Sequence, residues 1–489
     1  MFSSPISRRN FIKGSTSAIA IASFPSVVLG QATTTRLEWQ QFIANSSRFQ
    51  LFHDTVRAMR ANTNSGSPLS WAYWVNAHVN YCPHGTPYFL AWHRGYLYHF
   101  EQQLRKVLPN GAGSSLTLPY WDYYKYPRIP AEFTNAATGN ALYVPRQGTN
   151  VYNALNLSPF SSSVVNFQRN TTNAFETLVE SRPHNPVHNL IGGEMANMTS
   201  PRDPIFFLHH GNIDRLWNAW VRAGGKRMPY TSNPYNSTNS NTYWAGTFRY
   251  GPTMTIERYK TYTPGWLGNS YADNTQPTSL PPSAKSSSPF KLTQAQLPQF
   301  LARPAEGNFP AVAPRAVSAT SRSLGGVSGM ILDESSASAR LPLKASDVQA
   351  VKGAVSAALS PSVQLAPNAA RSVKVVLDNL QLRGAGAKGG YFYNIYINLP
   401  PTGDAMEGSQ KYLLGTVGPF EIAGASHHGS ATLEFPATEL LFRLSASNLE
   451  EVTISFERID CENAPRGQVL RIGEVRTELS TDAPWEGNP

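Results

Sequence analysis

The histidines of this chain are concentrated in its first half. Nine of the eleven lie between His53 and His210. His184 and His188 are four positions apart, so on a helix both imidazoles lie on one face and can point at one ion. A third donor is available at His209-His210, where another helical pattern begins. A lone pair at this spacing is more often two surface histidines, but the clustering predicts a metal site in the first half.

Two triplets of histidine can be drawn from this cluster, and neither contains a carboxylate or a thiolate. They are His78, His84 and His93, and then His184, His188 and His210. Imidazole suits copper, zinc, iron and nickel, and copper has the highest intrinsic affinity among these divalent ions. A three-histidine zinc site is the alternative for either triplet alone. Two similar triplets in one domain favour a paired site, in which both metals hold one small bridging molecule.

The first 32 residues predict an export signal. Ser7-Arg-Arg-Asn-Phe-Ile-Lys13 is followed by a weakly apolar stretch to Leu29 and by small residues up to Ala32, as in a twin-arginine signal cleaved near Ala32. The twin-arginine machinery exports folded proteins, so we expect a periplasmic or extracellular protein. No other segment is apolar enough to cross a membrane. The net charge of +10 is scattered without a basic run, which argues against nucleic acid as a partner.

The pattern along the chain predicts two domains joined by a linker. A mainly α core is expected over 33–275, with helical periodicity at 36–60, 91–107 and 165–181 and after Asp203-Pro204. Residues 276–324 are rich in proline, serine and alanine, as linkers are. An all-β sandwich is expected within 325–489, from strand-like runs at 371–382, 390–399, 412–422, 431–435, 440–445 and 452–458.

Longer motifs surround the histidines. They are His84-x8-His93-Arg-Gly-Tyr-Leu-Tyr-His-Phe-Glu101, Leu118-Pro-Tyr-Trp-Asp122, Pro183-His-Asn-Pro-Val-His188 and Ser200-Pro-Arg-Asp-Pro-Ile-Phe-Phe-Leu-His-His-Gly-Asn-Ile-Asp-Arg-Leu-Trp217. Together they resemble the copper-binding segments of the type 3 copper proteins, the family of tyrosinases, catechol oxidases and hemocyanins. The resemblance covers about residues 36–270.

The resemblance implies a four-helix bundle around two copper ions, with O2 as co-substrate. The first copper takes His78, His84 and His93, and the second takes His184, His188 and His210. In the family the second histidine of the His-His pair binds the metal, which leaves His209 behind the ligands or facing the substrate. Asp214, one turn after His210, is expected either to orient a ligand histidine or to pair with Arg215.

The two cysteines of the chain have two possible fates. An exported protein could join Cys82 and Cys461 in a disulfide. However, Cys82 lies two residues before His84, and fungal tyrosinases and molluscan hemocyanins form a thioether between a cysteine so placed and the ligand imidazole. The resemblance therefore favours a Cys82–His84 crosslink, which would restrict the ring and tune its donor strength.

The implied reaction is the oxidation of phenols by O2. An o-diphenol delivers two electrons and leaves as an o-quinone, and a site that admits a monophenol first hydroxylates the ring. Hydroxylation needs a deprotonated phenol, and the family holds a water for this purpose between a glutamate and an asparagine. Glu180, four residues before His184, and Asn185 match these positions, so a water between them could take the phenol proton.

Three functions remain open on the sequence. The first is a monophenol and o-diphenol oxidase, a tyrosinase, whose narrower version is a strict catechol oxidase. The openness of the entrance decides between those two, and Asn189, Asn197 and Met198 are expected there. The second is an O2 carrier of hemocyanin type, against which the export signal and the single copper unit argue. The third is a dizinc hydrolase, disfavoured because the motifs lack bridging carboxylates.

The C-terminal part resembles the shielding domain of plant polyphenol oxidases, most clearly at Gly390–Leu399. In that family the domain covers the copper site, puts one side chain into the substrate entrance and keeps the enzyme latent until it is removed or displaced. Tyr391, Phe392 and Tyr393 are the expected plug, and the proline-rich linker offers an activating protease a place to cut. The pair His427-His428 matches nothing in the family and is expected in a surface loop.

Overall fold

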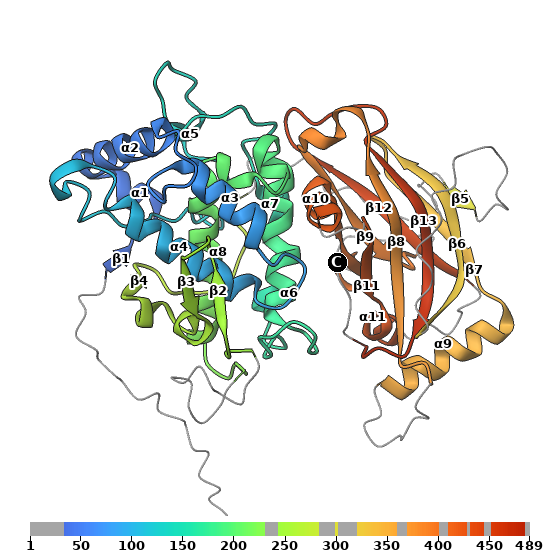
Figure 1. The fold of residues 1–489 in the computed structure, drawn as a ribbon. Coiled ribbons are helices and arrows are strands. Elements are labelled where there is room, and N and C mark those ends of the chain that lie inside the picture. Colours follow the sequence, from blue (N-terminus) through green and yellow to red (C-terminus); the bar gives the residue numbers. More distant parts are fainter. Residues whose placement is uncertain are drawn as a thin grey trace, which may run out of the picture.

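The computed structural model of the chain describes residues 34–229, 243–282, 299–301, 320–358, 369–400, 409–427, 431–444 and 451–484. The export signal expected over 1–32 and most of the expected linker lie outside these residues. The described chain forms a helical core (within 34–282) and a C-terminal β region (within 299–484), which lie side by side in Figure 1. Each has its own large cluster of buried apolar side chains.

The described part of the helical core contains eight α-helices and two pairs of short strands. The helices are α1 (Trp39–Ile43), α2 (Ser46–Ala61), α3 (Trp71–Tyr81), α4 (Phe89–Leu104), α5 (Ala131–Thr134), α6 (Phe175–Val179), α7 (Asn185–Ile191) and α8 (Ile205–Arg222). In the strand pairs, β1 (Thr34–Arg36) is parallel to β4 (Asn269–Tyr271), and β2 (Thr247–Arg249) is antiparallel to β3 (Thr255–Glu257). None of the described helices is both long and apolar enough to span a bilayer.

The central helix of the core is α8, which carries the His-His pair and is buried over most of its length. At its start, Asp203 Oδ1 accepts a hydrogen bond from the Ile205 N–H at 2.9 Å, and Pro204 has no N–H to leave unpaired. The helix predicted after Asp203-Pro204 is therefore confirmed. The helix predicted over 165–181 is shorter, because Asn170 and Asn173 adopt positive φ angles of 66° and 48° that interrupt it.

A buried ion network ties β1 and β4 to α4 and α8. Asp214 on α8 accepts hydrogen bonds from Arg94 Nε at 2.6 Å and from the Tyr271 hydroxyl, and it lies 3.7 Å from Arg36 Nη1. A buried charge without a partner destabilises a fold by several kcal/mol, so these groups depend on one another. Asp214 therefore serves the packing of the core, and both expectations for it, orientation of a ligand histidine or pairing with Arg215, are wrong.

The C-terminal β region contains two sheets and three α-helices in its described residues. The sheets have the strand orders β10-β9-β12-β7-β5 and β11-β8-β13-β6. The strands are β5 (Gln299–Leu301), β6 (Ser321–Leu332), β7 (Ala337–Pro342), β8 (Ser372–Leu382), β9 (Tyr391–Ile397), β10 (Leu413–Val417), β11 (Leu433–Pro436), β12 (Glu451–Asp460) and β13 (Leu470–Ser480). The helices are α9 (Ala345–Ala358), α10 (Pro419–His427) and α11 (Thr438–Arg443).

Two stretches of the β region differ from the strands that the sequence predicts. Residues 412–422 begin as β10 but continue after Gly418 as α10, and residues 440–445 fall largely in α11. Both are short apolar runs, in which periodicity does not separate a strand from a buried helix. The strands β6, β7 and β13 are not predicted by the sequence patterns, and β5 and the start of β6 fall within the expected linker.

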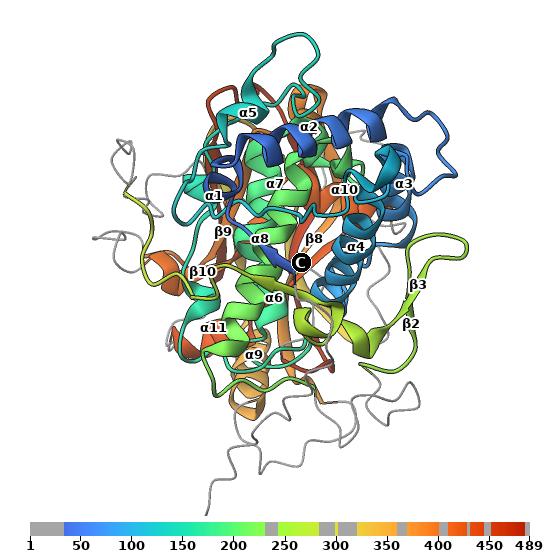
Figure 2. The same ribbon diagram turned by 90° about the vertical axis from the view of Figure 1, so that its left-hand side faces the viewer.

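The seam between the two parts is held by hydrogen bonds as well as by apolar packing. Arg182 Nη2 donates to Asn394 Oδ1 at 3.1 Å. At another edge, the Glu462 carboxylate accepts from the N–H and the hydroxyl of Thr149 at 3.1 and 3.0 Å. In Figure 1, α10 lies on the side of the β region that faces α7. Figure 2 looks from the helical side, so that the helices stand in front of the sheets.

Candidate metal centre

The first three predicted ligands meet inside the helical core. His78 lies on α3, His93 lies in the first turns of α4, and His84 lies in the loop between these helices. The ring centroid of His84 is 4.9 Å from that of His78 and 5.7 Å from that of His93. One ring nitrogen from each histidine and the Cys82 Sγ all lie within 4.8 Å of one another, which is close enough for a single ion.

The second three predicted ligands meet beside the first. His184 ends a π-helical turn, Glu180–His184, and His188 and His210 lie on α7 and α8. The His210 Nε2 is 3.3 Å from the Nε2 atoms of both His184 and His188, so the three nitrogens converge. The rings of His210 and His93 stack with centroids 4.2 Å apart. The structure thus brings all six predicted ligands into one centre.

Oxygen atoms of the protein orient four of the six imidazoles through Nδ1. The pairs are His78 with the Met198 carbonyl (2.8 Å), His93 with the Phe89 carbonyl (2.8 Å), His188 with the Met195 carbonyl (2.7 Å) and His184 with Asn185 Oδ1 (2.8 Å). A neutral ring that donates its Nδ1–H in this way presents an unprotonated Nε2, which is the form that binds a metal. The His78 Nε2 has no hydrogen-bond partner among the described residues, as a ligand atom requires.

All six histidines are buried, and burial lowers the pKa of each. In five of them the neighbouring imidazoles lower the pKa further, because two positive rings would repel one another. For His78 burial lowers the pKa to about 4. The centre therefore offers six neutral nitrogen donors near neutral pH. Such a donor set fits two copper ions, one for each triplet.

A phenylalanine from the β region covers this centre. The Phe420 ring, at the start of α10, stacks on His188 with centroids 4.0 Å apart and planes 15° apart. It also meets His84 and His184 edge-on, at 5.3 and 5.5 Å between centroids. Only 2% of the side chain is exposed. Phe420 therefore contacts ligands of both triplets and lies directly over the centre.

The α10 helix is fixed to the helical core through Asn189, the residue after His188. The Phe420 N–H donates to Asn189 Oδ1 at 2.9 Å, and Asn189 Nδ2 donates to Glu421 Oε2 at 2.6 Å. A Cβ on Gly418 would lie 2.4 Å from Asn189 Nδ2, so only glycine allows this approach. Both ends of one amide thus bind the segment that carries Phe420.

The expectation that Tyr391, Phe392 or Tyr393 covers the centre is corrected by this geometry. Tyr391 and Tyr393 point between the two sheets and belong to the core of the β region. Phe392 points to the opposite face of β9 and packs against the apolar cluster of the helical core. The sequence offered one local signal for Phe420, since Pro419 favours the first turn of a helix over a strand interior.

Comparison with known proteins agrees with the centre. The family model "Common central domain of tyrosinase" matches residues 45–162 and 134–223, a span that contains all six ligand histidines. The helical core belongs to the tyrosinase family of type 3 copper proteins. Copper, the metal that the donor set fits, is therefore also the metal of this family.

Two curated relatives and one solved structure show how far the likeness extends. Tyrosinase HcTyr1 of Hahella sp. (strain CCB-MM4) is 35% identical over 184 residues, which are 31% of this chain and 40% of that protein. Polyphenol oxidase C of Solanum lycopersicum is 27% identical over 228 residues, 34% of this chain and 36% of that protein. The match thus spans well under half of each relative. The structure of latent apple tyrosinase shares the fold, with a TM-score of 0.52 and 18% identity, over 92% of this chain and 98% of that one.

In this tyrosinase-family centre, Glu180 and Asn185 lie beside the ligands but have partners of their own. The buried Glu180 carboxylate accepts a hydrogen bond from the Gly85 N–H at 2.9 Å and is ion-paired with Arg169. Burial raises the pKa of Glu180, while Arg169 and the Gly85 N–H oppose that rise. Asn185 orients His184, as described above. Arg169 is missed by the sequence analysis, because only the fold brings this loop residue to Glu180.

Cys82 lies among the first three ligands. Its Sγ is 3.7 Å from His84 Nε2 and 3.5 Å from His93 Nε2, and burial raises the pKa of the thiol. Cys82 and Cys461 are both free in the structure. Cys461 lies at the seam, where its N–H donates to the Gly390 carbonyl at 2.9 Å.

The remaining predicted residues lie near the centre. The His209 ring stacks on His184 with centroids 5.2 Å apart, and neither of its ring nitrogens has a hydrogen-bond partner among the described residues. Asn189 contacts α10 and therefore lies where the β region meets the centre. The side chain of Met198 is buried, and its carbonyl holds His78.

Proposed function

We propose that this protein is a latent, copper-dependent phenol oxidase that converts o-diphenols to o-quinones with O2 and also hydroxylates monophenols. The observation that carries the proposal is the buried centre of six histidines under the Phe420 ring. A carrier of O2 would need access for a diatomic gas alone, whereas a planar aromatic ring already fits against His188 here. The Phe420 ring thus marks the position in which a phenol ring would lie.

The residues around the centre have separate tasks in this proposal. Two bound copper ions would supply the binding and reduction of O2 and the oxidation of the phenol. His78, His84 and His93 would hold one ion, and His184, His188 and His210 the other. Once Phe420 is displaced, the faces of His188 and the edge of His184 are free to align the phenol ring. The bound phenol ring would then take the place of Phe420 and shield the ligands from bulk water.

The hydroxylating step would use Glu180. Both of its carboxylate oxygens have one partner, but each keeps a further lone pair that can accept from a water. A water held there and near Asn185 would take the proton of a monophenol. The ion pair with Arg169 favours a narrower candidate, a strict catechol oxidase, because an adjacent cation makes a carboxylate a weaker base.

Latency would follow from the contacts of α10. While the Asn189 amide holds the Phe420 N–H and Glu421, no phenol reaches the ligands. Cleavage by a protease within 276–324, or movement of the β region, would remove the ring and open the centre. In this reading the helices α3, α4, α7 and α8 form the four-helix bundle of the family. The two sheets, whose first strands precede the expected range 325–489, form the shielding sandwich.

Two features of maturation belong to the same proposal. The Cys82 Sγ and a carbon of the His84 ring would join in a thioether. The bond replaces one S–H and one ring C–H, a two-electron oxidation for which O2 is the oxidant. Export through the twin-arginine machinery, signalled by Arg8-Arg9, would deliver a folded and metal-loaded protein to the periplasm or beyond.

Turnover of tyrosine and of a catechol by copper-loaded protein, before and after limited proteolysis, tests the function. We expect little turnover before cleavage and quinone formation from both substrates after it. Quinone from the catechol alone would establish the narrower candidate. The proposal fails if trimmed protein with two bound coppers oxidises neither substrate.

A further inference from the structure

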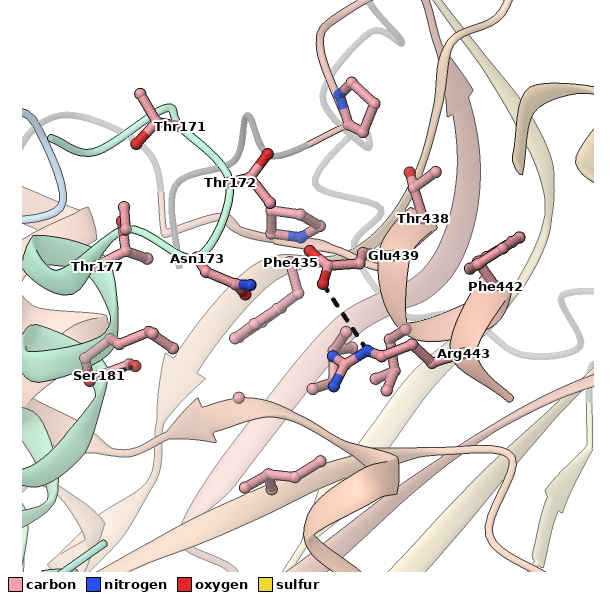
Figure 3. A pocket seen from close by; sticks show the side chains of 18 residues that line it. Thr171, Thr172, Asn173, Thr177, Ser181, Phe435, Thr438, Glu439, Phe442 and Arg443 are labelled. Carbon is pink, nitrogen blue, oxygen red and sulfur yellow. Dashed lines mark hydrogen bonds and ion pairs between the residues drawn. The ribbon is translucent and has the colours of Figure 1, made fainter. Parts of the chain in front are cut away.

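A cavity separate from the metal centre lies at the seam between the helical core and the β region (Figure 3). Its volume is about 450 Å³, and none of the six ligand histidines lines it. One wall is residues 171–181, which lead into and through α6, and the other wall comes from β10, β11 and α11. Sites for small molecules are typically about 300–1,000 Å³ and often lie between domains, so the size and place of this cavity suit a ligand.

The helical wall of the cavity is polar. Thr171, Thr172, Asn173, Thr177 and Ser181 present hydroxyl and amide groups along it (Figure 3). Asn173 adopts a φ of 48°, a conformation that asparagine tolerates better than most residues. The hydroxyls of Thr171 and Ser181 donate to the carbonyls of Gln168 and Leu178, so the donors that this wall offers to oxygen substituents of a ligand come from Thr172, Asn173 and Thr177.

The opposite wall combines an aromatic surface with a cation. Phe442 is 52% exposed, although a side chain of this size is usually buried, and the buried Leu440 and Phe435 line the same wall. The Arg443 Nε is 3.9 Å from Glu439 Oε1, which is too far for a hydrogen bond. Such an exposed, loose ion pair contributes little, so an incoming carboxylate can replace Glu439 on the guanidinium.

We propose that this cavity binds an aromatic carboxylate. Its ring lies against Phe442 and Leu440, its carboxylate pairs with Arg443, and its ring oxygens bond to Asn173 and Thr177. The planar guanidinium matches a carboxylate with two parallel hydrogen bonds. A neutral aromatic molecule would make no ion pair with Arg443, and a small anion would leave Phe442 exposed to water. Arg443 and Phe442 together therefore favour a ligand with both an aromatic ring and a carboxylate.

A molecule that touches both walls holds them together. The helical wall continues directly into the turn Glu180–His184, so the segment that carries Ser181 on the cavity side also carries a copper ligand. A ligand that binds only the closed arrangement raises the ratio of closed to open protein by the factor 1 + L/Kd, where L is its free concentration. This inference rests on the proposed latency. In it, aromatic carboxylates are effectors that keep Phe420 over the centre.

Calorimetric titration of the copper-free full chain with 3,4-dimethoxycinnamate tests the site. The methylated oxygens prevent oxidation, and no copper is present to bind the acid. We expect one site with a dissociation constant on the order of 1 mM or tighter, and weaker binding of the matching amide. Arg443→Gln weakens binding of the acid roughly fivefold to tenfold and removes the preference over the amide. Phe442→Ser weakens binding of both probes.

Matched controls are Arg57→Gln and Tyr126→Ser, which lie outside the cavity. Arg57 is an exposed arginine with an aspartate one turn before it, as Arg443 has Glu439, and Tyr126 is 46% exposed. Neither change affects binding if the site is as described. The proposal is overturned if the wild type does not bind the acid, if Arg443→Gln binds it as well as the wild type, or if Arg57→Gln loses as much.

The clamping effect has its own measurement. Saturating probe slows amide hydrogen exchange in residues 413–427 of the wild type and has no such effect in Arg443→Gln. Unchanged exchange in the wild type would refute the clamp while leaving the binding site in place. Phenol oxidation by a copper-loaded Phe420→Gly variant tests the proposed function separately, without any ligand in the cavity.

Discussion

Replacing Phe420 with glycine tests whether one ring keeps the copper centre closed. The ring is 2% exposed and stacks 4.0 Å from His188. Loss of a buried phenylalanine costs about 3–5 kcal/mol in a protein core. Phe420 belongs to the β region but contacts the helical core. Most of this loss therefore lowers the free energy that holds the β region against the helical core. If about 3 kcal/mol is lost, the open population rises about 100-fold, because about 1.4 kcal/mol is a factor of ten.

The assay is the initial rate of catechol oxidation by uncut, copper-loaded protein, divided by the rate after proteolysis. We expect this ratio to rise by up to about 100-fold in Phe420→Gly, with a ceiling where the uncut protein equals the trimmed protein. Phe420→Tyr keeps the ring and stays latent, and Tyr126→Gly, at an exposed position of the helical core, is unchanged. The reasoning is refuted if Phe420→Gly binds two coppers, is activated by protease, and yet is no more active than the wild type when uncut.

Three further outcomes follow from the same centre. Copper-free protein loses stability as the pH falls from about 6.5 toward 4, because the histidines bind protons in the unfolded chain but stay neutral when buried in the folded one. His78, with a pKa of about 4, accounts for about 3 kcal/mol of this loss. Thermal melts at pH 7 and 5 measure it, and equal melting temperatures would count against it. In a Phe420→Gly background, Arg169→Gln moves the acid limb of the monophenol pH profile to higher pH and leaves the diphenol profile in place, because Glu180 loses the cation that lowers its pKa. Parallel shifts of both profiles would exclude this role. Intact mass spectrometry of copper-loaded wild type, after treatment with a reductant that opens any disulfide, finds two hydrogen atoms fewer than the sequence requires, and Cys82→Ser removes the difference. The full sequence mass in the reduced wild type would contradict the thioether.

The ligand set could be predicted from the sequence because each ligand lies in a short motif with its own spacing. His184 and His188 are one helical turn apart, and His210 follows a helix start that Asp203 and Pro204 mark. Local rules of this kind survive folding, since neighbours along a helix remain neighbours in space. The copper centre was therefore predictable from the linear order of residues and from the family resemblance.

The cover of the centre could not be predicted in the same way. Phe420 lies more than 200 residues after its partner His188, within an apolar run that suits a strand as well as a helix. The resemblance drew attention to the aromatic residues of β9, but strand alternation turns two of them into the sheet core. Asp214 depends likewise on contacts between distant segments, and Arg169, only 11 positions before Glu180, meets it through the bend of the chain between them. The charge of a side chain does not say which partner it will meet.

Arg182 connects the second set of copper ligands to the β region. It lies two residues before His184, and its buried guanidinium donates to Asn394 on β9. Closing of the β region and occupation of the metal site therefore share one stretch of backbone. Linkage requires that if closure changes the affinity for copper by some factor, copper changes the closure equilibrium by the same factor. In the proposed latent enzyme, the closed form with copper and the closed form without copper would therefore differ in how readily the β region opens.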